Sequence, residues 1–158
     1  MLGPTPLSDD LKELIGLFQS HHVDFMVVGA HALALYARPR FTEDLDPFIR
    51  RTAENARRVR LALNAFGFGL TDEAESDLAG NPRGMLVLGR KPNQVDVLNF
   101  LDGVDFDLAW NRKVRGSLGE ISVDFLGLED YIATKRAAGR PKDLDDLHRL
   151  EQFRKEQA

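Results

Sequence analysis

Two aspartates one residue apart, Asp44 and Asp46, are the side chains of this sequence best suited to chemistry. Residues 45–49, Leu-Asp-Pro-Phe-Ile, predict a strand, in which positions i and i+2 face the same side. Both carboxylates would therefore point into one cleft, with the apolar Leu45 between them anchored in the core. Carboxylates this close repel each other, and a divalent cation is the simplest way to relieve that repulsion. The pair predicts a magnesium site suited to phosphate chemistry.

The elements that must position this pair are short. Residues 25–28 form a continuous apolar run that predicts a buried strand, and Gly29 ends it. The Ala- and Leu-rich residues 30–36 predict a helix, which Pro39 interrupts because proline biases the residue before it away from helical geometry. Gly29 would let the backbone approach a phosphate, and the helix from Ala30 would offer unpaired N–H groups. Gly29 could equally be an ordinary turn glycine.

The rest of the chain alternates helical and extended patterns. Helices are predicted from Ser8, which can cap the first one, and over residues 53–66, 106–110, 128–138 and 144–153. Strands are predicted over residues 85–88 and 94–98, joined into an antiparallel hairpin by a turn at 91–93, and over 112–114 and 121–125, joined through 116–119. The acid-rich residues 71–83 are predicted to form a loop. These elements predict a single α+β domain over residues 1–158, with a core of about 8–155, in which helices flank a mixed β-sheet.

Composition indicates a globular protein of the cytoplasm. The 158 residues contain 43% apolar side chains, and no run of apolar residues is long enough for a membrane span. The absence of cysteine excludes disulfides and thiolate zinc sites and fits a reducing compartment. Residues 1–10 lack the basic and apolar regions of a secretion signal. We therefore expect a cytoplasmic protein without membrane contact.

The formal net charge of −4 does not favour binding to nucleic acid by the molecule as a whole. Arginines nevertheless gather in one third of the chain, around the acidic pair: Arg38, Arg40, Arg50, Arg51, Arg57, Arg58 and Arg60. They could bind a polyphosphate or RNA, or they could form the solvent-exposed side of a helix.

Four motifs in order carry a resemblance to a known superfamily. They are Val27-Val28-Gly29-Ala30, Asp44-Leu45-Asp46, Gln94-Val95-Asp96-Val97-Leu98, and Lys135 followed by Arg140-Pro141-Lys142-Asp143-Leu144-Asp145-Asp146. Over about residues 25–150 the chain resembles the nucleotidyltransferase (polymerase-β-like) superfamily. Within it, the chain looks like the small bacterial branch that includes the AbiEii-type toxins of type IV toxin–antitoxin systems. This resemblance implies a nucleotidyltransferase fold, two Mg²⁺ ions and a nucleoside triphosphate as substrate.

The resemblance also implies roles for individual residues. Asp44, Asp46 and Asp96 would be catalytic and hold the metal ions, and Asp96 could also take the proton from an acceptor hydroxyl. Lys135 could reach the triphosphate as a point charge. The implied nucleotide-binding residues are Gly29, Ala30, Lys135, Arg140, Lys142 and Asp143.

The implied reaction moves a nucleoside monophosphate to a hydroxyl group and releases pyrophosphate. The acceptor would be the 3′ end of a tRNA, a protein or a small molecule, and the toxin branch implies an antitoxin partner. Two features depart from the branch. Ala30 stands where glycine or serine is expected, so a hydroxyl is missing from the phosphate site. The chain is also short for an AbiEii-type enzyme, so a partner or a second copy, as in a homodimer, would complete the acceptor site.

Each motif has a structural alternative. Asp96 could face water, because Val95 and Val97 could face the core, and Lys135 and Lys142 could be ordinary exposed lysines. Pro141 followed by acids makes a sound helix start without any function. His31 could touch a phosphate or be a buried histidine. For the whole protein, the alternatives are a non-catalytic nucleotidyltransferase-fold module that senses nucleotides or binds protein, and an RNA-binding protein that uses its arginines alone.

Overall fold

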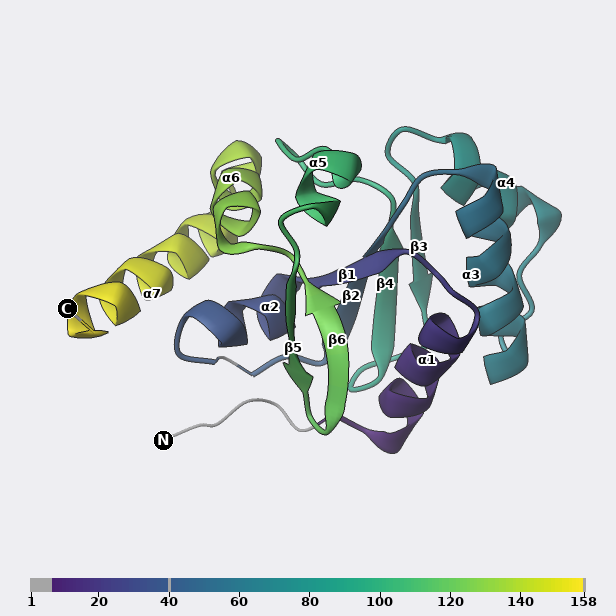
Figure 1. Cartoon of the computed structure of the whole chain (residues 1–158), viewed down its shortest axis with the longest axis horizontal. Coiled ribbons are helices and arrows are strands. Elements are labelled where there is room, and N and C mark those ends of the chain that lie inside the picture. Colours follow the sequence, from purple (N-terminus) through teal and green to yellow (C-terminus); the bar gives the residue numbers. More distant parts are fainter. Residues whose placement is uncertain (1–6, 40, 158) are drawn as a thin grey trace.

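A six-stranded β-sheet organises the residues that this computed structural model describes, 7–39 and 41–157 (Figure 1). Residues 1–6, 40 and 158 lie outside the described residues. The elements follow one another as α1 (Asp9–Ser20), β1 (Phe25–Val28), α2 (Gly29–Tyr36), β2 (Asp44–Ile49), α3 (Ala53–Phe66), α4 (Asp72–Gly80), β3 (Met85–Leu88), β4 (Gln94–Leu98), α5 (Phe106–Trp110), β5 (Val114–Leu118), β6 (Ile121–Phe125), α6 (Leu128–Ala138) and α7 (Pro141–Gln157).

The strands lie in the order β3-β4-β2-β1-β6-β5. The outer pairs, β3 with β4 and β5 with β6, are antiparallel, as expected for consecutive strands joined by short turns. β2 runs parallel to β4 and antiparallel to β1, and β1 runs parallel to β6. The sheet is therefore mixed, which confirms the predicted α+β fold. The antiparallel pairing of β3 with β4 confirms the predicted hairpin of residues 85–98.

Helices lie on both sides of the sheet. α1, α3 and α4 lie on one side, and α2, α6 and α7 lie on the other (Figure 1). All four residues of β1 are buried, as expected for a central strand with helices on both sides. β2 instead alternates, since Leu45 is buried whereas Asp44 and Asp46 are partly exposed. The face of β2 that carries the aspartates is therefore only partly covered.

The predicted loop over residues 71–83 is wrong, because most of it forms α4. The hydroxyl of Thr71 accepts a hydrogen bond from the backbone N–H of Ala74 and caps this helix. The acids that suggested a loop lie in the first helical turn, where they favour the positive end of the helix dipole. Leu78 is buried and fastens the helix to the core.

The predicted strand over residues 112–114 is displaced along the chain. β5 spans Val114–Leu118, and the turn to β6 consists of Gly119 and Glu120. Gly116 lies inside the strand. The ring of Phe125 lies 3.1 Å from where a Cβ of residue 116 would be, so a side chain there would be crowded. The sequence alone cannot distinguish such a packing glycine from a turn glycine.

The remaining predictions differ from the structure only at element ends. The capped start of α1 at Ser8 and the end of α3 at Gly67, which adopts a φ of 113°, are confirmed. α2 begins at Gly29 rather than Ala30, and α7 begins at Pro141 rather than Leu144 and continues to Gln157. Among the described helices, none is long and apolar enough to cross a membrane.

Candidate active site

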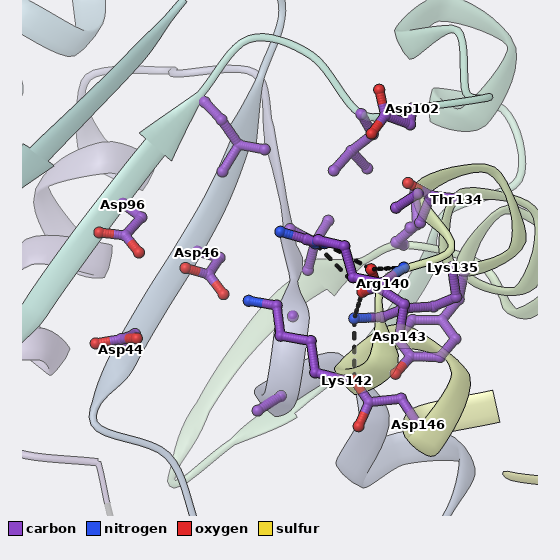
Figure 2. A pocket seen from close by; sticks show the side chains of 18 of the residues that line it. Asp44, Asp46, Asp96, Asp102, Thr134, Lys135, Arg140, Lys142, Asp143 and Asp146 are labelled. Carbon is purple, nitrogen blue, oxygen red and sulfur yellow. Dashed lines mark hydrogen bonds and ion pairs between the residues drawn. The ribbon is translucent and has the colours of Figure 1, made fainter. Parts of the chain in front are cut away.

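A cleft of about 660 Å³ opens where β2 and β4 face the junction of α6 and α7. Every residue that the sequence assigned to a site lines it: Gly29, Ala30, Asp44, Asp46, Asp96, Lys135, Arg140, Lys142 and Asp143. These residues come from strands and helices far apart in the sequence, and Figure 2 shows how their side chains converge.

The two strands that carry the aspartates are in register. β2 and β4 pair parallel, with Asp44 opposite Gln94 and Leu45 opposite Val95, so Asp46 comes beside Asp96. The two carboxyl groups are near enough for Asp96 to act on the acidity of Asp46. Figure 2 shows all three aspartates on the same side of the strands. Asp96 thus faces the cleft, and the alternative that it merely faces bulk water is wrong.

This crowding changes the acidity of the aspartates. Burial, followed by the charges of Asp96 and Asp44 and the hydrogen bond with Asp96, raises the pKa of Asp46 to about 7. The positive charge of Lys135 opposes this increase. Burial and then the charge of Asp96 also raise the pKa of Asp44. Near neutral pH, Asp46 can therefore hold a proton.

The donor atoms at this point suit a hard cation. Oδ1 of Asp44 is buried and has no hydrogen-bond donor among the described residues, and such an oxygen is a suitable ligand for Mg²⁺. In residues 7–39 and 41–157, no group of three or more histidine, cysteine or acidic side chains is arranged so that it could hold a metal ion. The chemistry of the donors fits magnesium, while their arrangement is that of two carboxyl groups side by side on paired strands, Asp46 and Asp96, with Asp44 next to them.

Gly29 has a role that neither sequence alternative included. Val28 pairs with Asp46 across β1 and β2, so the start of α2 lies directly beside that carboxylate. Gly29 has a φ of 71°, and a Cβ at this position would overlap Oδ2 of Asp46. The first turn of α2 has no side-chain cap, so its N–H groups are available where Gly29 and Ala30 line the cleft.

A buried ionic network fixes the opposite wall of the cleft. The ammonium of Lys135 lies 3.2 Å from Oδ1 of Asp143 and 3.0 Å from Oδ2 of Asp146, and both acids are 1% exposed. Arg140 donates from Nε to Oδ2 of Asp143 at 2.6 Å. Burial tends to raise the pKa of Asp143, but the hydrogen bonds from Arg140 and Lys135 outweigh it and lower that pKa. Asp143 therefore holds the two cations in place.

Unlike Lys135, which is 11% exposed, Lys142 has an exposed side chain, as Arg140 does. Figure 2 shows its ammonium group directed toward Asp44 and Asp46. The pKa of Arg140 is raised mainly by its hydrogen bond to Asp143 and to a smaller extent by the charge of Asp102. Asp102 thus acts on Arg140 from the end of the cleft opposite Asp44 (Figure 2).

One family model matches nearly the whole chain, over residues 7–158, and is described as "nucleotidyl transferase of unknown function (DUF2204)". The chain belongs to this family. The nucleotidyltransferase resemblance carried by the four sequence motifs is thereby confirmed. No curated protein matches the sequence.

In this nucleotidyl transferase family protein, several cleft residues have no role in the sequence-based prediction. One is Asp146, which belongs to the fourth motif and holds the ammonium of Lys135 as closely as Asp143 does. The signal was available, because residues i and i+3 of a helix share a face, so Asp143 and Asp146 point the same way. Arg83, Phe100 and Asp102 also line the cleft, and no local pattern connects them.

His31 and the described arginines of the group lie apart from the main cleft of this family member. His31 is buried, and burial lowers its pKa, in line with the alternative of a core histidine. Most described arginines of the group are engaged with acids: Arg38 with Glu156, Arg50 with Asp24 and Asp107, Arg58 with Glu54, and Arg60 with Asp72 and Glu75. Arg40 lies outside the described residues. These ion pairs disfavour RNA binding by the arginines alone.

Proposed function

We propose that this protein is a magnesium-dependent nucleotidyltransferase, which moves a nucleoside monophosphate from a nucleoside triphosphate to a hydroxyl group. One observation carries the proposal. The cleft combines three aspartates on adjacent strands, the uncapped start of α2 and the lysine-bearing junction of α6 and α7. Such transfers need little covalent help from the protein and depend on positioning and on positive charge at the phosphate oxygens.

The charge balance of the cleft supports a role for metal. Among its described lining residues there are seven aspartates but four lysines and arginines. An anionic triphosphate would be repelled unless cations enter with it. Asp44, Asp46 and Asp96 would hold Mg²⁺, which when bound supplies positive charge to the phosphate oxygens. A proton on Asp46, whose pKa is raised to about 7, would leave when the ions bind.

The residues around the aspartates would position the triphosphate. The N–H groups at the start of α2 would donate hydrogen bonds to phosphate oxygens. Lys142 would contribute a charge that is not already buried in a network, whereas Lys135 and Arg140 would act from positions fixed by Asp143 and Asp146. Ala30 would contribute its backbone only, since it has no hydroxyl.

The chemical step would use Asp96 as the base. As the acceptor oxygen forms a bond to the α-phosphorus, the bond to the bridging oxygen breaks and pyrophosphate leaves. The acceptor proton passes to Asp96. We propose as acceptor a hydroxyl group of a tRNA 3′ end, of a protein or of a small molecule. A role as the toxin of a toxin–antitoxin pair, with an antitoxin partner, belongs to the same proposal.

The test is transfer of radioactivity from four α-labelled nucleoside triphosphates to total RNA or to lysate in the presence of Mg²⁺. We expect a labelled band that a chelator abolishes and that Asp46→Asn eliminates. Asp124→Asn is the matched control, because Asp124 lies on β6 and pairs with Arg115 away from the cleft. Full labelling by Asp46→Asn would refute the assignment of the site.

Ala30 favours one second candidate, a nucleotide-binding module without turnover. A phosphate site that lacks a hydroxyl can bind a nucleotide with magnesium and still not process it. This candidate predicts saturable binding of a nucleoside triphosphate by calorimetry, together with no labelled product from any RNA or lysate. Turnover of any acceptor excludes it.

A further inference from the structure

Two side chains on the cleft wall form a flat, layered pair that the proposed reaction does not use. The guanidinium of Arg83 lies over the ring of Phe100, with its Cζ 4.2 Å from the ring centroid. Nη1 of Arg83 also donates to Oδ1 of Asp102 at 3.0 Å, which fixes the plane of the guanidinium. The Arg83 side chain nevertheless remains 63% exposed. All three residues line the same cleft as the aspartates.

A buried amide holds this pair in position. Asn99 donates from Nδ2 to the carbonyl oxygens of Leu78 and Asn81, at 3.0 and 2.7 Å. Its Oδ1 accepts from the backbone N–H of Gly84 at 2.8 Å. These bonds tie the segment before β3, which carries Arg83, to the segment just after β4, which carries Phe100. The pair is therefore fixed before any ligand arrives, so a ligand need not order it.

The other side of this segment rests on α6. Gly103 has a φ of 73°, and a Cβ there would come within 2.8 Å of the Cβ of Ala137. This close approach brings the chain after Phe100 against the helix that carries Lys135. The flat pair and the phosphate-facing cations thus belong to one cleft and not to two separate surfaces.

The surroundings of the pair are apolar. Met85 and Leu98 are opposite each other on β3 and β4, and both line the cleft together with Leu101. Met85 is 49% exposed, so its apolar side chain is accessible to a ligand in the cleft. At about 3.3 Å per residue, Leu98 lies roughly 7 Å along β4 from Asp96, and Phe100, two residues past the strand, lies at most roughly 13 Å away. A base joined through ribose to a phosphate held at the aspartates can reach this distance.

We infer that Phe100 and Arg83 form the platform on which the base of the bound nucleotide stacks, with Met85 and Leu98 beside it. The inference rests on the proposed function and deepens it. Nucleobases stack on aromatic rings and on guanidinium planes regardless of sequence, because every base has a flat π-face. One stacked base strengthens binding by roughly fivefold to a hundredfold.

The test compares ligands with and without a base. The affinity of the full chain for each nucleoside triphosphate and for inorganic triphosphate is measured by calorimetry with Mg²⁺. We expect nucleoside triphosphates to bind at least about tenfold more tightly than inorganic triphosphate. Phe100→Leu and Arg83→Gln should lose most of this preference while inorganic triphosphate binds as before. Phe100→Trp should retain it, since a larger ring preserves the stacking surface.

Arg115→Gln is the matched control, because Arg115 is also an exposed arginine paired with an aspartate, Asp124, but lies outside this cleft. Equal affinity of the wild-type protein for the two kinds of ligand would overturn the inference. So would equal loss for both ligands in Phe100→Leu, or no loss in either variant. If labelled product forms but nucleoside triphosphates bind no more tightly than inorganic triphosphate, only the inference of a platform fails. If no nucleotide binds, the proposed function and the platform fail together.

Discussion

The carboxylate of Asp46 occupies the space that a side chain at Gly29 would need, because β1 and β2 pair Val28 with Asp46. The backbone of α2 therefore begins in contact with an acid whose pKa is raised to about 7, chiefly by burial. A glycine and an aspartate separated by sixteen intervening residues thus depend on each other, and four predictions follow from this and neighbouring contacts.

Gly29→Ala is expected to lower the labelling activity by a larger factor than the free energy of unfolding. The positive φ alone costs about 1–2 kcal/mol for alanine, and the overlap with Asp46 adds displacement of that carboxylate. Gly119→Ala is the control, because Gly119 has a similar φ of 62° but only ordinary contacts around its Cβ position. Urea unfolding and nucleotide labelling are compared for both variants. Equal activity loss in the two variants would show that the overlap with Asp46 is harmless.

Stability without metal should fall as the pH rises from about 4 to 7. The pKa of Asp46 is about 7 in the folded protein and near the ordinary 3.8 in the unfolded chain, so the folded state binds more protons in this range. The free energy of unfolding should decrease by at most about 4 kcal/mol and then level off above pH 7. Asp46→Asn should flatten this dependence. Denaturant unfolding in a chelator, at a series of pH values, measures it, and Mg²⁺ at pH 8 should restore stability to the wild-type protein alone.

Lys135→Met is expected to destabilise the fold by about 3–5 kcal/mol. The substitution leaves Asp143 and Asp146 buried, with the ammonium that pairs with both of them removed. Arg149→Ala should cost at most about 1 kcal/mol, since its pair with Asp145 is exposed to solvent. Chemical denaturation measures both values. A similar small loss in the two variants would mean that burial of the network contributes little.

Asp96→Asn should separate catalysis from binding. Asparagine retains the shape of the side chain but cannot accept the proton of an acceptor hydroxyl, so the turnover number should drop by roughly a hundredfold or more. The affinity for a nucleoside triphosphate should change much less than the rate, because Asp44 and Asp46 remain. Rate measurements at saturating nucleotide, together with calorimetry, distinguish the two effects. Unchanged turnover would remove Asp96 from the role of base.

Local patterns were sufficient wherever one element decided the outcome. Three such predictions are confirmed: the alternation around Leu45, the N-terminal cap at Ser8 and the end of α3 before Gly67. Each depends on neighbours within a few residues. The prediction of a loop over residues 71–83 is wrong. Their acidic composition suggests a loop, but the cap at Thr71 and the helix dipole favour a helix there. Prediction also failed at Gly116, because the neighbour that requires a glycine is Phe125, on the adjacent strand.

The sequence by itself determined that Asp44 and Asp46 share one side of a strand, because side chains alternate along every strand. Only the tertiary structure decided that Asp96 lies beside Asp46, that Asp146 holds Lys135, and that Arg83 covers Phe100. Those contacts join segments that the chain keeps far apart. They depend on strand register and on burial, which arise only when the sheet and its helices pack together.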